Sequence, residues 1–332
     1  MSALYPMKFE PIFRDKIWGG QNIKTVLNQD FGDLPNCGEL WALSGFPGSE
    51  SVVSNGFLAG NELNELVEVY MDELVGEKNH EVYGNVFPLL IKILDASDWL
   101  SIQVHPDDDL ARQRGLEGGK TEMWYILQAE KEAKLIAGFN QKVNQNIYLQ
   151  KIKDKQLTEI MNFEEVEAGD VYYMPAGRVH ALGPGIMLAE IQQTSDTTYR
   201  IYDWDRVDEQ GKGRELHLQE AMAAIDFELA DTYKSHYTAK KNETVSLVKS
   251  EFFISNLIDL DIALVKDFTE LDSFVIYLCT EGVFELDDKI HDKVLVSAGE
   301  TVLLPASATK IELKPLNKAK LIEVYILLPN EN

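Results

Sequence analysis

Short apolar runs, separated by turn-forming residues, follow one another along most of this chain. Gly, Pro, Asp or Asn residues bound many of these runs, as is typical of β-strands. Examples are LLIKIL, KLIAGF, GDVYYMP, MLAEIQQ, SFVIYLC and ETVLLP. Many short strands at close spacing favour a β-sandwich or a β-barrel. The pattern therefore predicts a mainly β fold.

Three stretches have helical periodicity and interrupt the strands. In the first, NELNELVEVYMDELVGEKN, apolar residues recur at helical spacing: Leu63, Leu66, Val67, Tyr70, Met71 and Leu74. The second runs through DLARQRGLE, and either Asp107 or Asp108 is suited to cap its start. The third is HLQEAMAAIDF. We expect a short helix from each.

A stretch of low apolar content near residues 230–245, ADTYKSHYTAKKNET, has the composition of a linker. The β-pattern resumes after it and continues to the C-terminus. We therefore expect two domains: residues 1–232, which contain the helical segments, and residues 240–332, a smaller β domain. A chain of 332 residues is long enough for two domains with buried cores.

The chain is strongly acidic, with 31 Lys and Arg residues against 55 Asp and Glu residues and a formal net charge of −24. Nucleic acid and anionic membranes are therefore excluded as the main partners, because both would be repelled. An anionic small molecule would be repelled at long range as well. Its binding would need a local group of cationic side chains.

The two cysteines and the apolar stretches indicate the cellular compartment of the protein. Cys37 and Cys279 lie far apart and have no spacing typical of a disulfide framework, a metal site or a redox motif. The start, MSALYPMKFEP, lacks the basic and apolar regions of a signal peptide. The longest apolar stretches, VFPLLIKIL and LIEVYILLP, are too short to span a bilayer. We expect a cytoplasmic protein.

Two segments repeat a common pattern. GDVYYMPAGRVH (residues 169–180) and GETVLLPASATK (residues 299–310) both have Gly, five residues and Pro. Both resemble the second sequence motif of cupins, which fold as a double-stranded β-helix of the jelly-roll type. The first copy continues with Gly177 and His180, whereas the second has Ser307 and Lys310. The resemblance implies two cupin-like jelly-roll domains, of which only the first can supply a metal ligand.

A second group of polar residues lies at the end of the strand-like run SIQVHPDD. Alternation places Ser101, Gln103 and His105 on one face of that strand. Glu122, in GKTEMWY, and His180 complete a mixed nitrogen and oxygen set suited to Zn²⁺, or to Fe²⁺, Mn²⁺ or Co²⁺. Burying Glu122 without a cation would cost several kcal/mol. Taken singly, the same residues are also typical of a surface amide and of hydrogen-bonded core histidines.

Cationic residues accompany this group. Lys120, two residues before Glu122, would face the same cavity on a strand, or it could extend from the cavity mouth to solvent. Arg200 and Arg206, in QTSDTTYRIYDWDR, could clamp an anion because guanidinium binds phosphate in a bidentate manner. The alternative is simple pairing with neighbouring aspartates, which are Asp203, Asp205 and Asp208. The residues alone indicate a metal-binding cupin that acts on an anionic small molecule.

Six segments, in this order, resemble the type I mannose-6-phosphate isomerases (phosphomannose isomerases) in their short bacterial form. They are FRDKIWGG, GELWALSGFPGSESVVSNG, FPLLIKILDASDWLSIQVHPDD, GKTEMWYIL, GDVYYMPAGRVHALGPG and QTSDTTYRIYDWDR. The resemblance covers nearly the whole chain, and QVHPDD and GKTE are its most specific motifs. It implies one Zn²⁺ ion per chain, with Co²⁺ or Mn²⁺ as substitutes. By motif, its ligands fall on Gln103, His105, Glu122 and His180.

The resemblance also implies roles for residues around the metal. The catalytic arginine and lysine fall on Arg200 and Lys120, a substrate-binding serine on Ser101, and an aromatic wall at the mouth of the site on Trp18. Fungal relatives have a phosphate-binding lysine where this chain has Arg206, so the charge is kept but the contact differs. The implied reaction interconverts mannose 6-phosphate and fructose 6-phosphate by proton transfer between C1 and C2 through an enediol or enediolate. The metal and the cationic side chains would stabilise its oxyanion.

Several alternatives stay open from the sequence. A metal-dependent cupin oxygenase would use the same histidines and carboxylate, and a sugar-phosphate sensor would bind without turnover. The base that takes the carbon-bound proton could be Lys120, a metal-bound water or a further carboxylate. The second domain could serve packing, dimerisation or partial closure of the site, and both a monomer and a dimer are compatible with the sequence.

Overall fold

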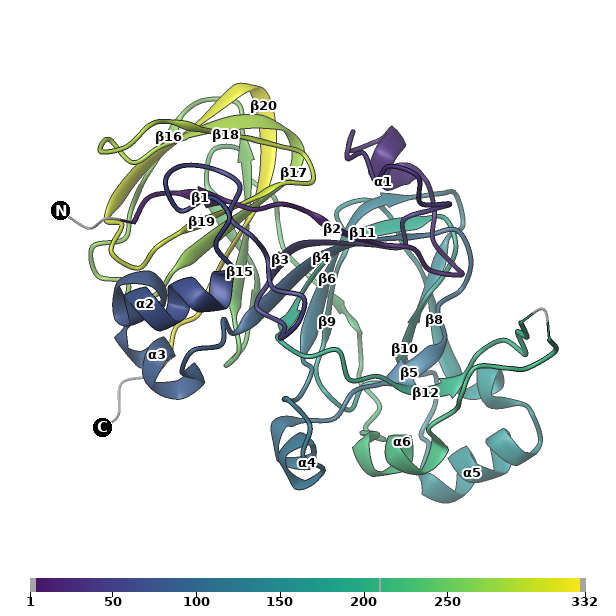
Figure 1. Ribbon diagram of the computed structural model, residues 1–332. Helices are drawn as coiled ribbons and strands as arrows, with labels where there is room; N and C mark the ends of the chain where they lie inside the picture. Colours follow the sequence, from purple (N-terminus) through teal and green to yellow (C-terminus); the bar gives the residue numbers. More distant parts are fainter. Residues whose placement is uncertain (1–3, 209, 329–332) are drawn as a thin grey trace.

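The computed structural model describes residues 4–208 and 210–328 and consists mainly of β-strands arranged in three sheets (Figure 1). Two of the sheets face each other and form the first jelly roll. The third sheet curls around a core of its own. The mainly β, cupin-like fold that the sequence predicts is therefore confirmed.

The first sheet has seven strands in the order β13-β9-β6-β11-β4-β3-β2, and all its neighbours are antiparallel. Its strands are β2 (Ile12–Arg14), β3 (Glu39–Ser44), β4 (Leu89–Ala96), β6 (Glu122–Ala129), β9 (Val171–Met174), β11 (Ile186–Gln193) and β13 (Lys234–Ser235). Every residue of β4 is buried, which explains the continuous apolar run LLIKIL. A strand buried on both faces needs apolar residues on both.

The second sheet has five strands in the order β12-β5-β10-β7-β8 and covers one face of the first. Its strands are β5 (Ile102–Val104), β7 (Lys134–Phe139), β8 (Met161–Glu165), β10 (His180–Leu182) and β12 (Tyr199–Tyr202). Helices α5 (Gln145–Lys153) and α6 (Leu218–Ala224) lie beside it in Figure 1, and α4 (Asp108–Gln113) lies near α6. The 3₁₀ turn η1 (Leu157–Ile160) follows α5. Tyr148 of α5 packs there against Ile136 and Ala181 in one apolar cluster.

The third sheet contains the C-terminal strands and the first strand of the chain. Its strands are β1 (Met7–Lys8), β14 (Thr244–Lys249), β15 (Ile254–Leu260), β16 (Leu264–Asp267), β17 (Val275–Asp287), β18 (Val294–Ser297), β19 (Thr301–Leu304) and β20 (Lys310–Tyr325). β1 pairs with β19, so that Met7 lies opposite Leu303. We propose that β14 to β20 correspond to the second domain expected from the sequence, with β1 added at its edge.

One apolar cluster joins this sheet to the free face of the first. It contains Ile91 and Ile93 of β4 together with Ile276 of β17 and Ile322 of β20. Three further helices, of which the two longer lie beside the third sheet in Figure 1, are α1 (Asn22–Thr25), α2 (Leu63–Val75) and α3 (Glu77–Tyr83). No helix of the described residues is long and apolar enough to cross a bilayer.

The two repeated segments adopt the same local structure. In the first, β9 is followed by Pro175 and then by β10, which begins at His180. In the second, β19 is followed by Pro305 and then by β20, which begins at Lys310. Lys310 pairs with Asp267 at the surface. The second copy therefore repeats the strands of the first without its metal ligand.

The three expected helical segments are all present: the first as α2 together with α3, the second as α4 and the third as α6. Helix α5 was not expected, because the short segment QNIYLQKIK buries only Tyr148 fully and has little apolar periodicity. The stretch 230–245, expected to be a linker, is bound to both sheets of the first jelly roll: β13 pairs with β9 of the first sheet, and the Tyr233 hydroxyl bonds to the backbone of Phe139 in β7 of the second.

Candidate metal centre

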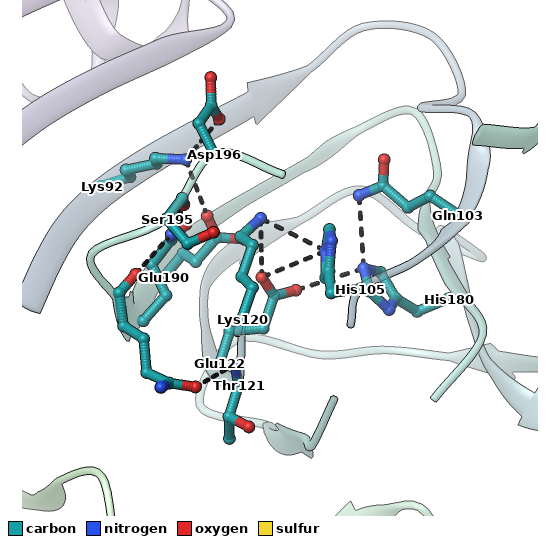
Figure 2. A network of polar contacts seen from close by, with 12 residues as sticks. Lys92, Gln103, His105, Lys120, Thr121, Glu122, His180, Glu190, Ser195 and Asp196 are labelled. Atoms are coloured by element: carbon teal, nitrogen blue, oxygen red, sulfur yellow. Dashed lines mark hydrogen bonds and ion pairs between the residues drawn. The ribbon is translucent and has the colours of Figure 1, made fainter. Parts of the chain in front are cut away.

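Three strand ends bring a carboxylate and two imidazoles together inside the first jelly roll. His105 follows β5, Glu122 begins β6 and His180 begins β10. Their ligand atoms all lie within 4.8 Å of one another, and all three residues are buried. His180 Nε2 is 3.3 Å from Glu122 Oε1, and His105 Nε2 is 3.6 Å from Oε2 (Figure 2). The two sheets thus converge on one point.

Backbone carbonyls fix both imidazole rings. His105 Nδ1 lies 2.8 Å from the carbonyl oxygen of Thr197, and His180 Nδ1 lies 2.9 Å from that of Arg178. Because a carbonyl only accepts, each Nδ1 carries the proton and each Nε2 has a free lone pair. This is the tautomer in which histidine binds a metal through Nε2.

Burial keeps the two rings neutral. It lowers the pKa of His180 to about 4, and the positive charge of Lys120 acts in the same direction. The pKa of His105 is also well below its ordinary value, first because of burial and then because of Lys120 and His180. Both rings therefore present lone pairs at neutral pH.

Glu122 is the feature that most needs a cation. It is completely buried, and apart from its ion pair with Lys120 no donor among the described residues reaches either carboxylate oxygen. A buried carboxylate without hydrogen bonds is costly, whereas one carboxylate and two imidazole nitrogens are ordinary ligands of Zn²⁺ and of similar divalent ions. The residues present therefore fit a metal ion.

Gln103 lies beside this group on β5. It is opposite His180 on β10 and opposite Arg200 on β12, so the three side chains share one face of the second sheet. Its Nε2 is 3.3 Å from His180 Nε2 (Figure 2). A half-turn of the amide would present Oε1 to the same point. The role of Gln103 as a ligand stays a prediction.

Lys120 reaches into the same group. Its Nζ lies 3.0 Å from Glu122 Oε2 and 3.3 Å from His105 Nε2. Burial by itself would lower the pKa of Lys120, but the negative charges of Glu122, Glu190 and Asp196 outweigh it and raise the pKa above its ordinary value. Lys120 is therefore a buried ammonium group that faces the metal ligands and does not extend to solvent.

A second buried ion pair, not identified from the sequence, adjoins the first. Lys92 of β4 and Glu190 of β11 are cross-strand neighbours, with Nζ 3.5 Å from Oε1. Trp124 Nε1 donates to Glu190 Oε2 at 2.9 Å. Lys92 Nζ lies 3.8 Å from Asp196 (Figure 2). Burial raises the pKa of Glu190, and the charge of Glu122 adds to this effect.

The signal for this pair was a charged residue in the middle of each of two apolar runs, LLIKIL and MLAEIQQ. Lysine and glutamate are almost never fully buried unless they are paired. A lysine and a glutamate in two buried strands therefore indicate a partnered site. The same observation identifies a candidate for the carboxylate base that the sequence left open.

Arg200 belongs to the row that contains Gln103 and His180. Its Nη1 donates to the carbonyl of Glu215 at 2.9 Å, and its backbone N–H donates to His217 Nδ1. Its Nε is buried and has no partner among the described residues. Burial lowers the pKa of Arg200, followed by the charge of Arg214. The guanidinium is therefore held in place, and its Nε–H is still available to donate a hydrogen bond.

Arg206 is paired with an aspartate, the alternative that the sequence also allowed. Its Nη2 lies 2.5 Å from Asp203 Oδ1, and its Nη1 donates to the carbonyl of Trp99 at 2.7 Å. Arg214, which was not expected from the sequence, binds the same carboxylate through Nε at 2.8 Å and through Nη2. Two guanidinium groups thus share one carboxylate next to Arg200.

The remaining two expected residues lie inside the jelly roll. Ser101 is buried directly before β5, two residues from Gln103. Trp18 is 4% exposed and packs in the apolar cluster that contains Leu94 and Trp124. The Trp124 ring meets His180 edge-on at 5.2 Å. Contact of Ser101 or Trp18 with a substrate stays a prediction.

Comparison with known proteins identifies relatives of one kind. Residues 7–143 match the family model of the type I phosphomannose isomerase catalytic domain. A mannose-6-phosphate isomerase of Streptococcus mutans is 41% identical over 257 residues, which are 74% of this chain and 77% of that protein. Mannose-6-phosphate isomerase ManA of Bacillus subtilis is 43% identical over 225 residues, 67% of this chain and 68% of that protein.

Solved structures agree with these matches. The crystal structure of the mannose 6-phosphate isomerase from Bacillus subtilis superimposes with a TM-score of 0.86 at 32% identity, over 97% of this chain and 99% of that one. A mutant phosphomannose isomerase from Salmonella typhimurium has a TM-score of 0.78 at 16% identity, over 97% of this chain and all of that one, and shares the fold.

Removal of one imidazole tests the metal centre. We expect His180→Ala to lower the affinity for Zn²⁺ by at least about 100-fold, because it removes a ligand and leaves Glu122 without one of its neighbours. The measurement is calorimetric titration of the chelated protein with Zn²⁺. His236→Ala, at an exposed histidine, is the control. Equal affinity in the two variants would exclude His180 as a ligand.

Proposed function

This chain belongs to the type I phosphomannose isomerase family, and we propose that it interconverts mannose 6-phosphate and fructose 6-phosphate with a Zn²⁺ ion bound by Gln103, His105, Glu122 and His180. The observation that carries this proposal is the buried carboxylate of Glu122, which lies between two neutral imidazoles and beside a buried ammonium group. Co²⁺ and Mn²⁺ would suit the same ligands. When bound, the metal would stabilise negative charge on a substrate oxygen.

The reaction moves a proton between two carbon atoms. From the aldose, a base removes the proton on C2, and the enediol forms as the C1=C2 double bond; the same proton is returned to C1. The proton of the O2 hydroxyl moves to O1, which leaves the C2 carbonyl of the ketose. Such a base needs a pKa closer to neutrality than an ordinary carboxyl group has.

Glu190 has the properties of that base. Its carboxylate is buried inside the first jelly roll, and burial together with Glu122 raises its pKa. Trp124 and Lys92 hold its two oxygens in place. Lys120, by contrast, has a raised pKa and stays protonated. We therefore assign Lys120 to charge stabilisation of the developing oxyanion and Glu190 to proton transfer.

The arginines supply the recognition of phosphate. Arg200 has a buried Nε with no partner among the described residues, and Arg206 and Arg214 share the carboxylate of Asp203. Arg206 also pairs with Asp98 at 3.4 Å. Three guanidinium groups beside these two carboxylates leave local positive charge in a chain of net charge −24. Ser101, at the start of β5, would add a hydroxyl on the same side. A phosphate dianion can use this excess charge, which an unphosphorylated sugar cannot.

A coupled assay with mannose 6-phosphate, which follows the formation of fructose 6-phosphate, tests the reaction and the metal together. We expect turnover that chelation abolishes and that Zn²⁺ restores. The untreated enzyme, diluted in the same way, is the control. If the metal-loaded protein binds the sugar phosphate but does not turn it over, the proposal is wrong and the chain is a sugar-phosphate sensor.

Replacement of the proposed base tests its role. We expect Glu190→Gln to keep the metal and to lower kcat at least about 100-fold, because the amide cannot accept the proton from C2. Transfer of deuterium from C2-labelled mannose 6-phosphate to C1 of the product should fall in parallel. Glu323→Gln alters an equally buried glutamate of the third sheet and is the matched control. A variant that keeps more than about a tenth of kcat would rule out Glu190 as the base.

Arg200→Ala tests the phosphate site. We expect this variant to retain its metal and to lose nearly all activity, since it removes the guanidinium group that shares a face with Gln103 and His180. Inhibition by inorganic phosphate should weaken as well. Arg112→Ala, at an exposed arginine of α4, is the control. If phosphate inhibits Arg200→Ala as strongly as the wild-type enzyme, a group other than Arg200 binds the phosphate.

A further inference from the structure

The segment that carries Lys120 into the site has no regular secondary structure. Residues 118–121 precede β6, which begins at Glu122, and Gly118 and Gly119 have no side chains that could pack. Yet the Lys120 ammonium lies within 3.3 Å of two proposed metal ligands, His105 and Glu122. Hydrogen bonds to the backbone of the segment contribute to fixing its position, among them those from Ser195 Oγ to the carbonyl of Gly118 at 3.1 Å and from the N–H of Gln193 to the carbonyl of Thr121 at 3.2 Å.

Two side chains supply such bonds on both sides of Lys120. The N–H of Gly119 donates to Asp108 Oδ1 at 2.7 Å, and the N–H of Thr121 donates to Gln193 Oε1 at 2.8 Å. Gln193 Nε2 in turn donates to Oδ1 and Oδ2 of Asp108, both at 3.2 Å. The two side chains thus bind each other as well as the segment.

Close backbone contact completes the arrangement. The N–H of Lys120 donates to the carbonyl of Pro106 at 3.0 Å. A Cβ atom added to Gly119 would lie 2.6 Å from the backbone nitrogen of Asp108, so only glycine allows this approach. The motifs HPDD and GKTE, separate in the sequence, are therefore bonded directly to each other through Asp108 and the segment before Lys120.

Packing does not hold the segment from its outer side. A cavity of about 520 Å³ opens there, lined by Asp108, Gly118, Gly119 and Gln193 together with apolar residues that include Val86 and Leu116. The hydrogen bonds of Asp108 and Gln193 are therefore the contacts that separate the segment from this space.

We propose that Asp108 and Gln193 form a clasp that positions the Lys120 ammonium against the metal ligands. Neither side chain is placed among the reacting groups; they act through the backbone of residues 119–121. The inference rests on the proposed function, because it assigns the clasp to the group that stabilises the oxyanion. A small displacement of such a group lowers kcat more than it changes substrate binding.

Within the clasp, Gln193 donates and Asp108 accepts, and exchanging these two roles tests the proposal. In Gln193→Glu, the new carboxylate can still accept from Thr121, but its other oxygen faces the Asp108 carboxylate, which repels it. In Asp108→Asn, the side-chain amide places an N–H group against the N–H of Gln193 Nε2. Two donors then face each other, and one hydrogen bond is lost. In the double variant D108N/Q193E, the asparagine donates to the new carboxylate, and every backbone bond is kept at the wild-type net charge.

The experiment compares these variants in kcat, KM, bound metal and hydrogen exchange of the peptide that contains residues 118–121. We expect each single variant to lower kcat about tenfold to a hundredfold, with KM within about threefold and metal content unchanged. Exchange in the peptide should accelerate. The double variant should recover most of kcat and slow the exchange again.

Asp109→Asn is the matched control, because it removes a charge from the same first turn of α4 at an exposed residue that does not contact the segment. Wild-type kcat in both single variants, an equal loss in the control, or no recovery in the double variant would each overturn the proposal. If the wild-type protein does not isomerise mannose 6-phosphate, the proposed function fails. Exchange of residues 118–121 then still tests the clasp, and equal exchange in all variants would overturn it.

Discussion

The buried charge of Glu122 is the constraint on which the rest of the site depends. Two imidazoles held neutral by burial present lone pairs to it, and these stabilise a carboxylate only when a cation lies between them. Lys120 keeps its proton because the charges of Glu122, Glu190 and Asp196 outweigh its burial. Burial raises the pKa of Glu190, and the charge of Glu122 raises it further. The charge of Glu122 thus favours the protonated form of both neighbours.

Much of the fold and of the metal centre could be predicted because both follow from local spacing. Strand alternation places Gln103 and His105 on one face, and the Gly-x5-Pro pattern places His180 directly after a tight turn at the start of a strand. The meeting of these residues with Glu122 was predictable only from the cupin resemblance. Their actual contact depends on the pairing of strands that are distant in the chain, such as β5 with β10.

Other features could not be predicted, for identifiable physical reasons. In strands buried on both faces, alternation does not show which face meets the cavity, so the sequence indicates that Lys92 and Glu190 are paired but not that they adjoin the metal ligands. From the sequence, Asp107 and Asp108 were equally suited to cap the N-terminus of α4. In the structure Asp107 alone accepts the N–H of Leu110, which leaves Asp108 free to bind Gly119. Arg214 lies in an irregular segment after β12, where no periodicity indicates a partner.

The pairing of β1 with β19 has a consequence for how the protein is made. β1 is synthesised almost 300 residues before its partner strand, since Met7 lies opposite Leu303. Until then the apolar face of β4, which packs against β17 and β20, has no cover. The nascent first jelly roll therefore exposes a sheet surface during synthesis. Cutting the gene at the apparent domain boundary would make that exposure permanent.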